Sequence, residues 1–151
     1  MALVFVYGTL TDPRRVSTLL DSVDLGPEAV CYGLTRVDGR YPTLCPGDRV
    51  CGRLLATPEI SRLDDYEGVD RGLYCRCSIP LDSAGGSDAV ESAFDADSVE
   101  TYIGDPAALG VSERVDWPGS GSLERRVAAY IETNPVRVRP ETGPETTLDD
   151  L

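Results

Sequence analysis

The run MALVFVYGTL at residues 1–10 decides how this chain begins to fold. Residues 2–7 are apolar, with β-branched and aromatic side chains, and this composition predicts a short buried strand. Gly8 ends the run and lets the chain turn sharply, so that the next backbone N–H groups can converge on one point. Asp12 and Pro13 follow as a helix cap and a proline at the first helical position. We therefore expect a strand, a tight turn and a helix in succession.

The same reasoning, applied outward along the chain, predicts a mixture of strands and helices. Helices are expected at residues 13–21, 59–66 and 122–133, and strands or extended pieces at residues 28–37, 41–44, 49–55, 73–80, 98–104 and 136–138. Gly26-Pro27 is interpreted as a chain break and Pro46-Gly47-Asp48 as a turn. The irregular order of these elements favours an α+β fold over a regular βαβ array.

The length of 151 residues points to one domain, which we place at residues 1–139. Residues 140–151 are acidic and rich in Thr, and we expect them to form a disordered tail. Residues 82–97, rich in Ser, Ala, Gly and Asp, are interpreted as a long solvated loop or a loose hairpin.

The composition excludes several classes of chemistry. The chain has 26 Asp and Glu against 14 Arg, no Lys and no His, and a net charge of −12. Without His there is no Ser-His or Cys-His catalytic pair and no imidazole metal ligand, and without Lys there is no Schiff base. The negative charge argues against nucleic-acid binding, which needs a basic surface. Acid–base chemistry is left to a carboxylate, a Tyr or a Cys.

Acidic residues without Lys favour a protein adapted to high salt, where a short Debye length weakens self-repulsion. An ordinary acidic protein is the alternative. The five Cys form no CxxC pair, so we expect reduced cysteines in a cytoplasmic protein rather than a zinc site or a disulfide framework. We expect neither a signal peptide nor a membrane span, because the apolar runs are short and the first one lacks a basic start.

Two segments are candidates for the functional site. Residues 7–10, YGTL, place a strand end, a glycine and a nearby helix N-terminus together, which suits a small carboxylate ligand; an ordinary turn is the alternative. In LDDYEG at residues 63–68, the i, i+3 spacing predicts that Leu63 and Tyr66 face the core and that the two aspartates between them face solvent. Glu67 then stands at the helix C-terminus, whose negative dipole raises the pKa of a carboxyl, as a proton-transfer role requires. A solvated acidic helix end is the alternative there.

A third candidate lies on the strand predicted at residues 73–80. Tyr74 and Arg76 share one face of this strand, because side chains alternate along it. They either line a pocket or form an outward arginine beside a half-buried tyrosine.

These segments, taken in order, resemble the γ-glutamylcyclotransferase-like family, which includes the AIG2-like proteins. The resemblance covers about residues 3–80 and resumes near residues 99–106. The matching segments are VFVYGTL (4–10), YPTL (41–44), GRLL (52–55), LDDYEGVDRGLYCR (63–76) and VETYIGDP (99–106).

The resemblance implies a mixed β-barrel of about five to seven strands with flanking helices and one cavity. The glutamate of the family's EG motif falls on Glu67, the general acid/base. The family's substrate loop falls on Tyr7, Gly8, Thr9 and Leu10, whose backbone amides would hold the γ-glutamyl group, and a family tyrosine falls on Tyr74. No metal or cofactor is implied, and the expected partner is a small γ-glutamyl substrate bound by a monomer or homodimer.

The reaction so implied is the cyclisation of a γ-glutamyl peptide or amine to 5-oxoproline with release of the amine. A second hypothesis is a non-catalytic protein that keeps the pocket for a small metabolite. The presence of Glu67 favours the enzyme, because a site for an anionic ligand gains nothing from an extra acid. A third hypothesis, an acidic interaction protein or DNA mimic, predicts no cavity, and the well-patterned apolar strands count against it.

Overall fold

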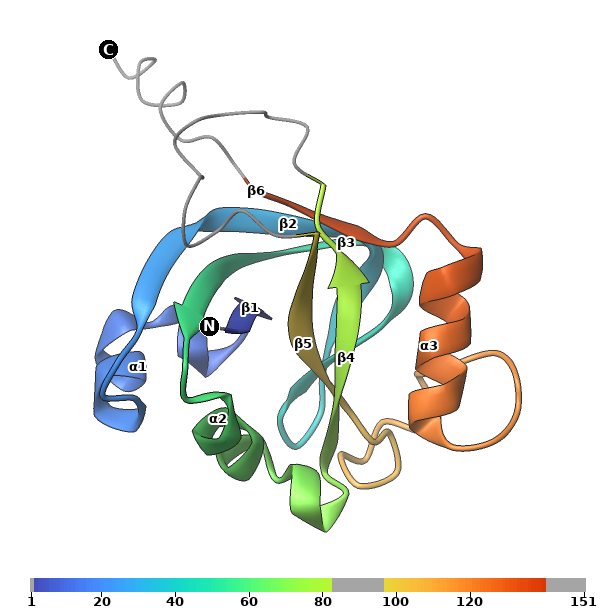
Figure 1. Ribbon diagram of the computed structural model, residues 1–151. Helices are drawn as coiled ribbons and strands as arrows, with labels where there is room; N and C mark the ends of the chain where they lie inside the picture. The colour runs from blue at the N-terminus through green and yellow to red at the C-terminus, as the bar shows by residue number, and fades with distance from the viewer. Residues whose placement is uncertain (1, 83–96, 141–151) are drawn as a thin grey trace.

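The computed structural model describes residues 2–82 and 97–140, which form a curled sheet flanked by helices (Figure 1). In these residues the sheet has six strands in the order β4-β5-β1-β3-β2-β6. β1 pairs in parallel with β5, and the other neighbours are antiparallel. The strands are β1 (Ala2–Val6), β2 (Asp24–Asp38), β3 (Pro42–Thr57), β4 (Tyr74–Pro80), β5 (Ser98–Gly104) and β6 (Arg137–Pro140).

The long hairpin of β2 and β3 curls because its pairing register shifts twice. One shift lies between Leu25 and Glu28, and the other lies at Gly33, between Tyr32 and Leu34. Bulges of this kind bend a strand and increase its twist. Gly33 has a φ of 97°, and a Cβ there would lie 2.8 Å from a methyl carbon of Val136. Only glycine allows both this backbone conformation and this close approach.

The two edge strands of the sheet meet at one end, which completes the barrel-like shape. Leu81, directly after β4, forms a parallel bridge with Val138 of β6. The N–H of Asp82 donates to the carbonyl of Val138 at 2.7 Å. This contact covers part of both edges, whose backbone groups would otherwise be open to pairing with another chain. The expected α+β fold with a mixed barrel is therefore confirmed.

Three α-helices flank the sheet: α1 (Pro13–Leu19), α2 (Ile60–Glu67) and α3 (Leu123–Thr133). The expected cap is present on α1, where the side chain of Asp12 accepts a hydrogen bond from the Arg14 N–H. α3 is capped in the same way by Ser122, which the sequence analysis had placed inside the helix. α3 runs along β4, whereas α1 and α2 lie at the opposite side of the sheet (Figure 1). Val127 is fully buried, and α3 is held by this apolar face.

The core is one contiguous cluster to which all six strands contribute. Its largest fully buried aliphatic side chains include Leu34, Leu44, Leu54, Ile79 and Ile103. Burial of each such side chain contributes about 1.5–3 kcal/mol to folding.

Two of the sequence predictions about strand ends are wrong. Gly26-Pro27 does not break the chain, and Pro46-Gly47-Asp48 is not a turn, because both lie inside the continuous strands β2 and β3. Each segment falls at a register shift, where the sheet accommodates extra residues as a bulge. The loop predicted at residues 82–97 and the tail predicted at residues 140–151 lie, apart from residues 82, 97 and 140, outside the described residues. No helix among the described residues is long and apolar enough to cross a bilayer.

Candidate active site

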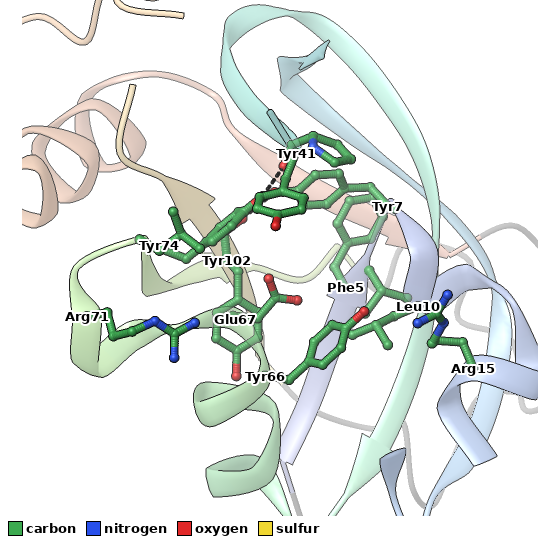
Figure 2. Close-up of a pocket in the computed structure, with 14 residues that line it drawn as sticks. Phe5, Tyr7, Leu10, Arg15, Tyr41, Tyr66, Glu67, Arg71, Tyr74 and Tyr102 are labelled. Carbon is green, nitrogen blue, oxygen red and sulfur yellow. Dashed lines mark hydrogen bonds between the residues drawn. The ribbon is translucent and has the colours of Figure 1, made fainter. Parts of the chain in front are cut away.

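A cavity of about 410 Å³ opens between β1, α2 and the starts of β3 and β4. Figure 2 shows that its walls are largely aromatic. The aromatic side chains come from segments far apart in the sequence: Phe5, Tyr7, Tyr41, Tyr66, Tyr74 and Tyr102. The chain has 7 Tyr, 2 Phe and 1 Trp, so this cavity gathers most of its aromatic side chains.

Glu67 is the acidic residue that lines this cavity, and its carboxylate points into the enclosed space (Figure 2). It is the last residue of α2, which ends at Gly68 in the left-handed conformation, with a φ of 71°. Burial raises the pKa of Glu67 from 4.5 to about 7. The sequence reasoning expected a raised pKa from the helix dipole, whereas the structure identifies desolvation as the cause.

Tyr7 follows β1 and is held at the cavity wall by a hydrogen bond. Its hydroxyl donates to the backbone carbonyl of Tyr102 at 2.5 Å. Burial raises the pKa of Tyr7 well above its usual range, and nearby Tyr74 and Glu67 raise it further. Tyr7 therefore stays neutral and acts as a hydrogen-bond donor at any physiological pH.

Tyr74, the first residue of β4, also lines the cavity. Its hydroxyl donates to the backbone carbonyl of Pro42, the first residue of β3. Burial raises its pKa, and the negative charge of Glu67 adds to the effect. Tyr74 thus joins two strands at the cavity and keeps its proton.

The loop after β1 contributes Gly8 and Leu10 to the cavity, and Thr9 opens the short 3-10 helix η1 (Thr9–Thr11). The N–H and hydroxyl of Thr11 both donate to the Gly8 carbonyl, at 3.0 and 2.7 Å. No hydrogen bond donated by the Gly8 N–H is found within residues 2–82 and 97–140. Gly8 is not among the glycines with positive φ. The absence of a side chain at Gly8 leaves space beside the Pro42 ring, from which a Cβ would lie 3.4 Å away.

The sequence reasoning misplaced two side chains of α2. Tyr66 does not face the core: it is 38% exposed and lines the cavity mouth. Asp64 does not simply face solvent, because its carboxylate contacts two other side chains. Its Oδ1 accepts a 2.7 Å hydrogen bond from the Tyr102 hydroxyl and lies 3.3 Å from Nε of Arg76. The less exposed face of α2 follows residues 60, 63, 64 and 67, of which Leu63 is fully buried. This i, i+3, i+4, i+7 spacing was the available signal.

Tyr41, Arg15 and Arg71 are among the cavity residues that were not predicted. Tyr41 was interpreted only as part of an extended piece. Arg71 stands in the same segment as Glu67, four positions later, yet nothing in its spacing indicates that its side chain turns back toward the cavity. Among the described residues, no group of three or more Cys, Asp or Glu side chains is arranged to hold a metal ion.

Comparison with known proteins places this chain in a family. A family model described as "Gamma-glutamyl cyclotransferase, AIG2-like" matches residues 4–118. The chain belongs to this family. The curated "AIG2-like protein C" of Arabidopsis thaliana is 31% identical over 126 residues, which span 76% of this chain and 67% of that protein.

Three solved structures are similar to this chain in fold. A structure titled "Gamma-glutamyl cyclotransferase" has a TM-score of 0.57 at 14% identity, covering 88% of this chain and 99% of its own. An uncharacterized Homo sapiens protein has a TM-score of 0.55 at 16% identity, covering 85% of this chain and 97% of its own. An Arabidopsis thaliana protein solved in solution has a TM-score of 0.51 at 24% identity, covering 87% of this chain and 83% of its own. At these identities the likeness concerns the fold.

Proposed function

We propose that this member of the family is an enzyme that cyclises γ-glutamyl compounds to 5-oxoproline, with Glu67 as general acid/base. The observation that carries the proposal is a desolvated carboxylate, with a pKa raised to about 7, pointing into an aromatic cavity. A carboxyl that titrates near neutral pH is well suited to accept and return a proton.

The chemistry needs one proton carrier and a folded substrate. The α-amine nitrogen attacks the γ-carbonyl carbon and forms the new C–N bond of the ring. The amide C–N bond then breaks and releases the amine. Glu67 accepts a proton from the attacking nitrogen and returns it to the leaving nitrogen, so the reaction consumes neither water nor cofactor. The aromatic walls exclude water and hold the substrate in a folded conformation. The α-amine is thereby kept close to the γ-carbonyl carbon.

The loop of Tyr7, Gly8, Thr9 and Leu10 is the proposed site of the γ-glutamyl carboxylate. The Gly8 N–H has no partner in the described part of the chain, and the side chain that Gly8 lacks leaves room beside Pro42. A backbone N–H suits a carboxylate in a chain with a net charge of −12. Tyr74 is proposed as part of the same substrate wall.

The direct experiment is Glu67→Gln, assayed by mass spectrometry of 5-oxoproline over a panel of γ-glutamyl dipeptides and amides. We expect turnover to fall by about 10²- to 10⁴-fold, the usual contribution of a general acid/base. The control is Asp65→Asn, which removes an exposed carboxylate from the same helix and should leave turnover unchanged. Near-normal turnover by Glu67→Gln contradicts the proposed role.

The alternative, a binding protein without catalysis, gives a different result in the same experiment. The wild-type chain would then bind γ-glutamyl ligands and release no 5-oxoproline from any of them.

A further inference from the structure

Two of the free cysteines, Cys75 and Cys77, lie on the same face of β4, because side chains alternate along a strand. The Cys77 thiol donates to the carbonyl oxygen of Cys75 at 3.9 Å, so its sulfur turns back toward its neighbour. A hydrogen bond between the two thiols lowers the pKa of Cys75, and burial opposes this effect only in part. Cys75 and Cys77 therefore form a thiol pair, in which the thiol of one residue stabilises the thiolate of the other.

The thiol pair is reached from a groove between β4 and α3, which lie side by side (Figure 1). Cys75 is 6% exposed, whereas Cys77 is partly exposed and lines the groove. The groove is separate from the cavity that contains Glu67, because no described residue lines both. A small solute can therefore approach the thiol pair without entering the cavity.

Arg76, the residue between the two cysteines, connects β4 to α2. Its Nε lies 3.3 Å from Oδ1 of Asp64, and its Nη1 lies 4.0 Å from Oε1 of Glu100. The same oxygen of Asp64 accepts the 2.7 Å hydrogen bond from the hydroxyl of Tyr102, whose side chain lines the cavity. The conformation of β4 at position 76 is thus linked to the cavity wall through two successive contacts.

A disulfide between residues i and i+2 of one strand requires the strand to shorten. Cα atoms two residues apart in an extended strand are separated by about 6.6–6.8 Å. Disulfides join Cα atoms that are about 4.4–6.8 Å apart, and the commonest separation is about 5.5–6 Å. Oxidation of the thiol pair would therefore draw the backbone together at Arg76 and displace its guanidinium from Asp64.

We propose that the thiol pair is a site of reversible oxidation by hydrogen peroxide, and that the resulting Cys75–Cys77 disulfide loosens the contact between β4 and α2 at Asp64. Strained disulfides have less negative reduction potentials, so a thiol reductant opens this bridge readily. The inference goes beyond the proposed function and does not depend on it.

The oxidation balances without any further reactant. The thiolate of the pair attacks one peroxide oxygen, which breaks the O–O bond and gives a sulfenic acid and hydroxide. The second sulfur then attacks the sulfenic sulfur, forms the S–S bond and expels the oxygen as hydroxide. The protons of the two thiols convert both hydroxides to water, and two electrons pass from the sulfurs to the peroxide.

The first test treats the reduced chain with a small molar excess of hydrogen peroxide, then unfolds it and labels it with N-ethylmaleimide. The reduced chain should take up five labels, one on each cysteine, and the oxidised chain three, because two of the five are bridged. Trypsin, which cuts after Arg71 and Arg76, should give two fragments that stay joined until a thiol reductant is added. Cys77→Ser and Cys75→Ala should remove the bridge. Cys51→Ser, which removes the exposed cysteine of β3, should retain it.

Hydrogen exchange followed by mass spectrometry tests the effect on α2. The amides of β4 and α2 should exchange about 5- to 30-fold faster in the oxidised chain, as expected when one or two contacts are lost. Dithiothreitol should restore the rates of the reduced chain. Arg76→Gln should accelerate exchange in α2 of the reduced chain to the same extent, and oxidation should then add nothing there.

Two kinds of result would overturn the inference. One is overoxidation to sulfinic or sulfonic acid without a bridge, or a bridge that still forms in Cys77→Ser. The other is a Cys75–Cys77 bridge that leaves the exchange of α2 unchanged. Neither measurement uses turnover, so a chain that releases no 5-oxoproline contradicts the proposed function alone.

Discussion

The hydroxyl of Tyr7 donates a 2.5 Å hydrogen bond to the backbone carbonyl of Tyr102, 95 positions later in the chain. This bond joins the end of β1 to β5 at the wall of the cavity, where the two strands run in parallel. The Tyr102 side chain continues the connection, because its own hydroxyl donates to Asp64 of α2 at 2.7 Å. β1, β5 and α2 are thereby held together around the carboxylate of Glu67.

Loss of the Tyr7 hydroxyl should destabilise the fold. Tyr7→Phe removes a buried hydrogen bond while keeping the ring, so we expect the free energy of unfolding to fall by about 1–2 kcal/mol. Urea denaturation measures this change. Tyr32→Phe is the matched control. Cζ of Arg137 lies 5.1 Å from the centroid of the Tyr32 ring, and phenylalanine keeps this contact because it keeps the ring. Equal losses in the two variants would show that the Tyr7–Tyr102 bond does not stabilise the fold.

Glu67 should make stability depend on pH. Burial raises its folded-state pKa to about 7, so between pH 4.5 and 7 the folded protein binds more protons at this site than the unfolded chain. Its contribution is therefore most favourable below pH 4.5 and is lost as pH rises to about 7. Glu67→Gln should match the wild type near pH 4 and be more stable by about 1–3 kcal/mol at pH 8. A stability difference that is constant across this range, measured by urea denaturation, would contradict the burial of the carboxyl.

Turnover should depend on the same titration of Glu67, but it should rise with pH where the stability contribution of Glu67 falls. Because the proposed base is the ionised form of Glu67, kcat should rise about tenfold per pH unit on the acid side and level off above about pH 7. The measurement is the pH profile of 5-oxoproline release with γ-glutamylglycine. An acid limb centred near 4.5 instead would mean that the working carboxyl is solvated.

A side chain at position 8 should be compatible with folding, but a large one should block ligand binding in the cavity. Its φ is not in the left-handed region, and a Cβ would make an ordinary contact with Pro42 at 3.4 Å. Gly8→Ala and Gly8→Val should therefore both fold, which thermal denaturation can check. We expect Gly8→Val to lose ligand binding, measured by calorimetry, because its methyl groups fill the space beside the loop. Wild-type affinity in Gly8→Val would exclude this loop from the site.

Much of the local structure could be predicted, because its causes are local. The strand at residues 98–104 was predicted with the bounds of β5, and the predicted cap at Asp12 depends only on residues next to it in the chain. The errors occurred where tertiary pairing overrides a local preference. Gly26-Pro27 and Pro46-Gly47-Asp48 have the composition of turns, yet the long β2–β3 hairpin absorbs both as bulges.

The candidate site could be located only in part from the sequence, for the same reason. The motif containing Glu67 is visible in the sequence, and the family match covers it. The orientation of Tyr66 was misjudged because an eight-residue helix offers few positions from which to find its buried face. Arg71 was missed because its approach to the cavity depends on the backbone conformation at Gly68.

The sequence alone determined the kinds of element, their order and the chemistry left to a chain without His or Lys. These properties depend on composition and on neighbours a few positions apart. Only the tertiary structure decided that Glu67 is desolvated and that Tyr7, Tyr74 and Tyr102 surround it. Burial depends on which distant segments the sheet brings together, and the pairing of β1 with β5, residues 2–6 with residues 98–104, is set by the whole fold.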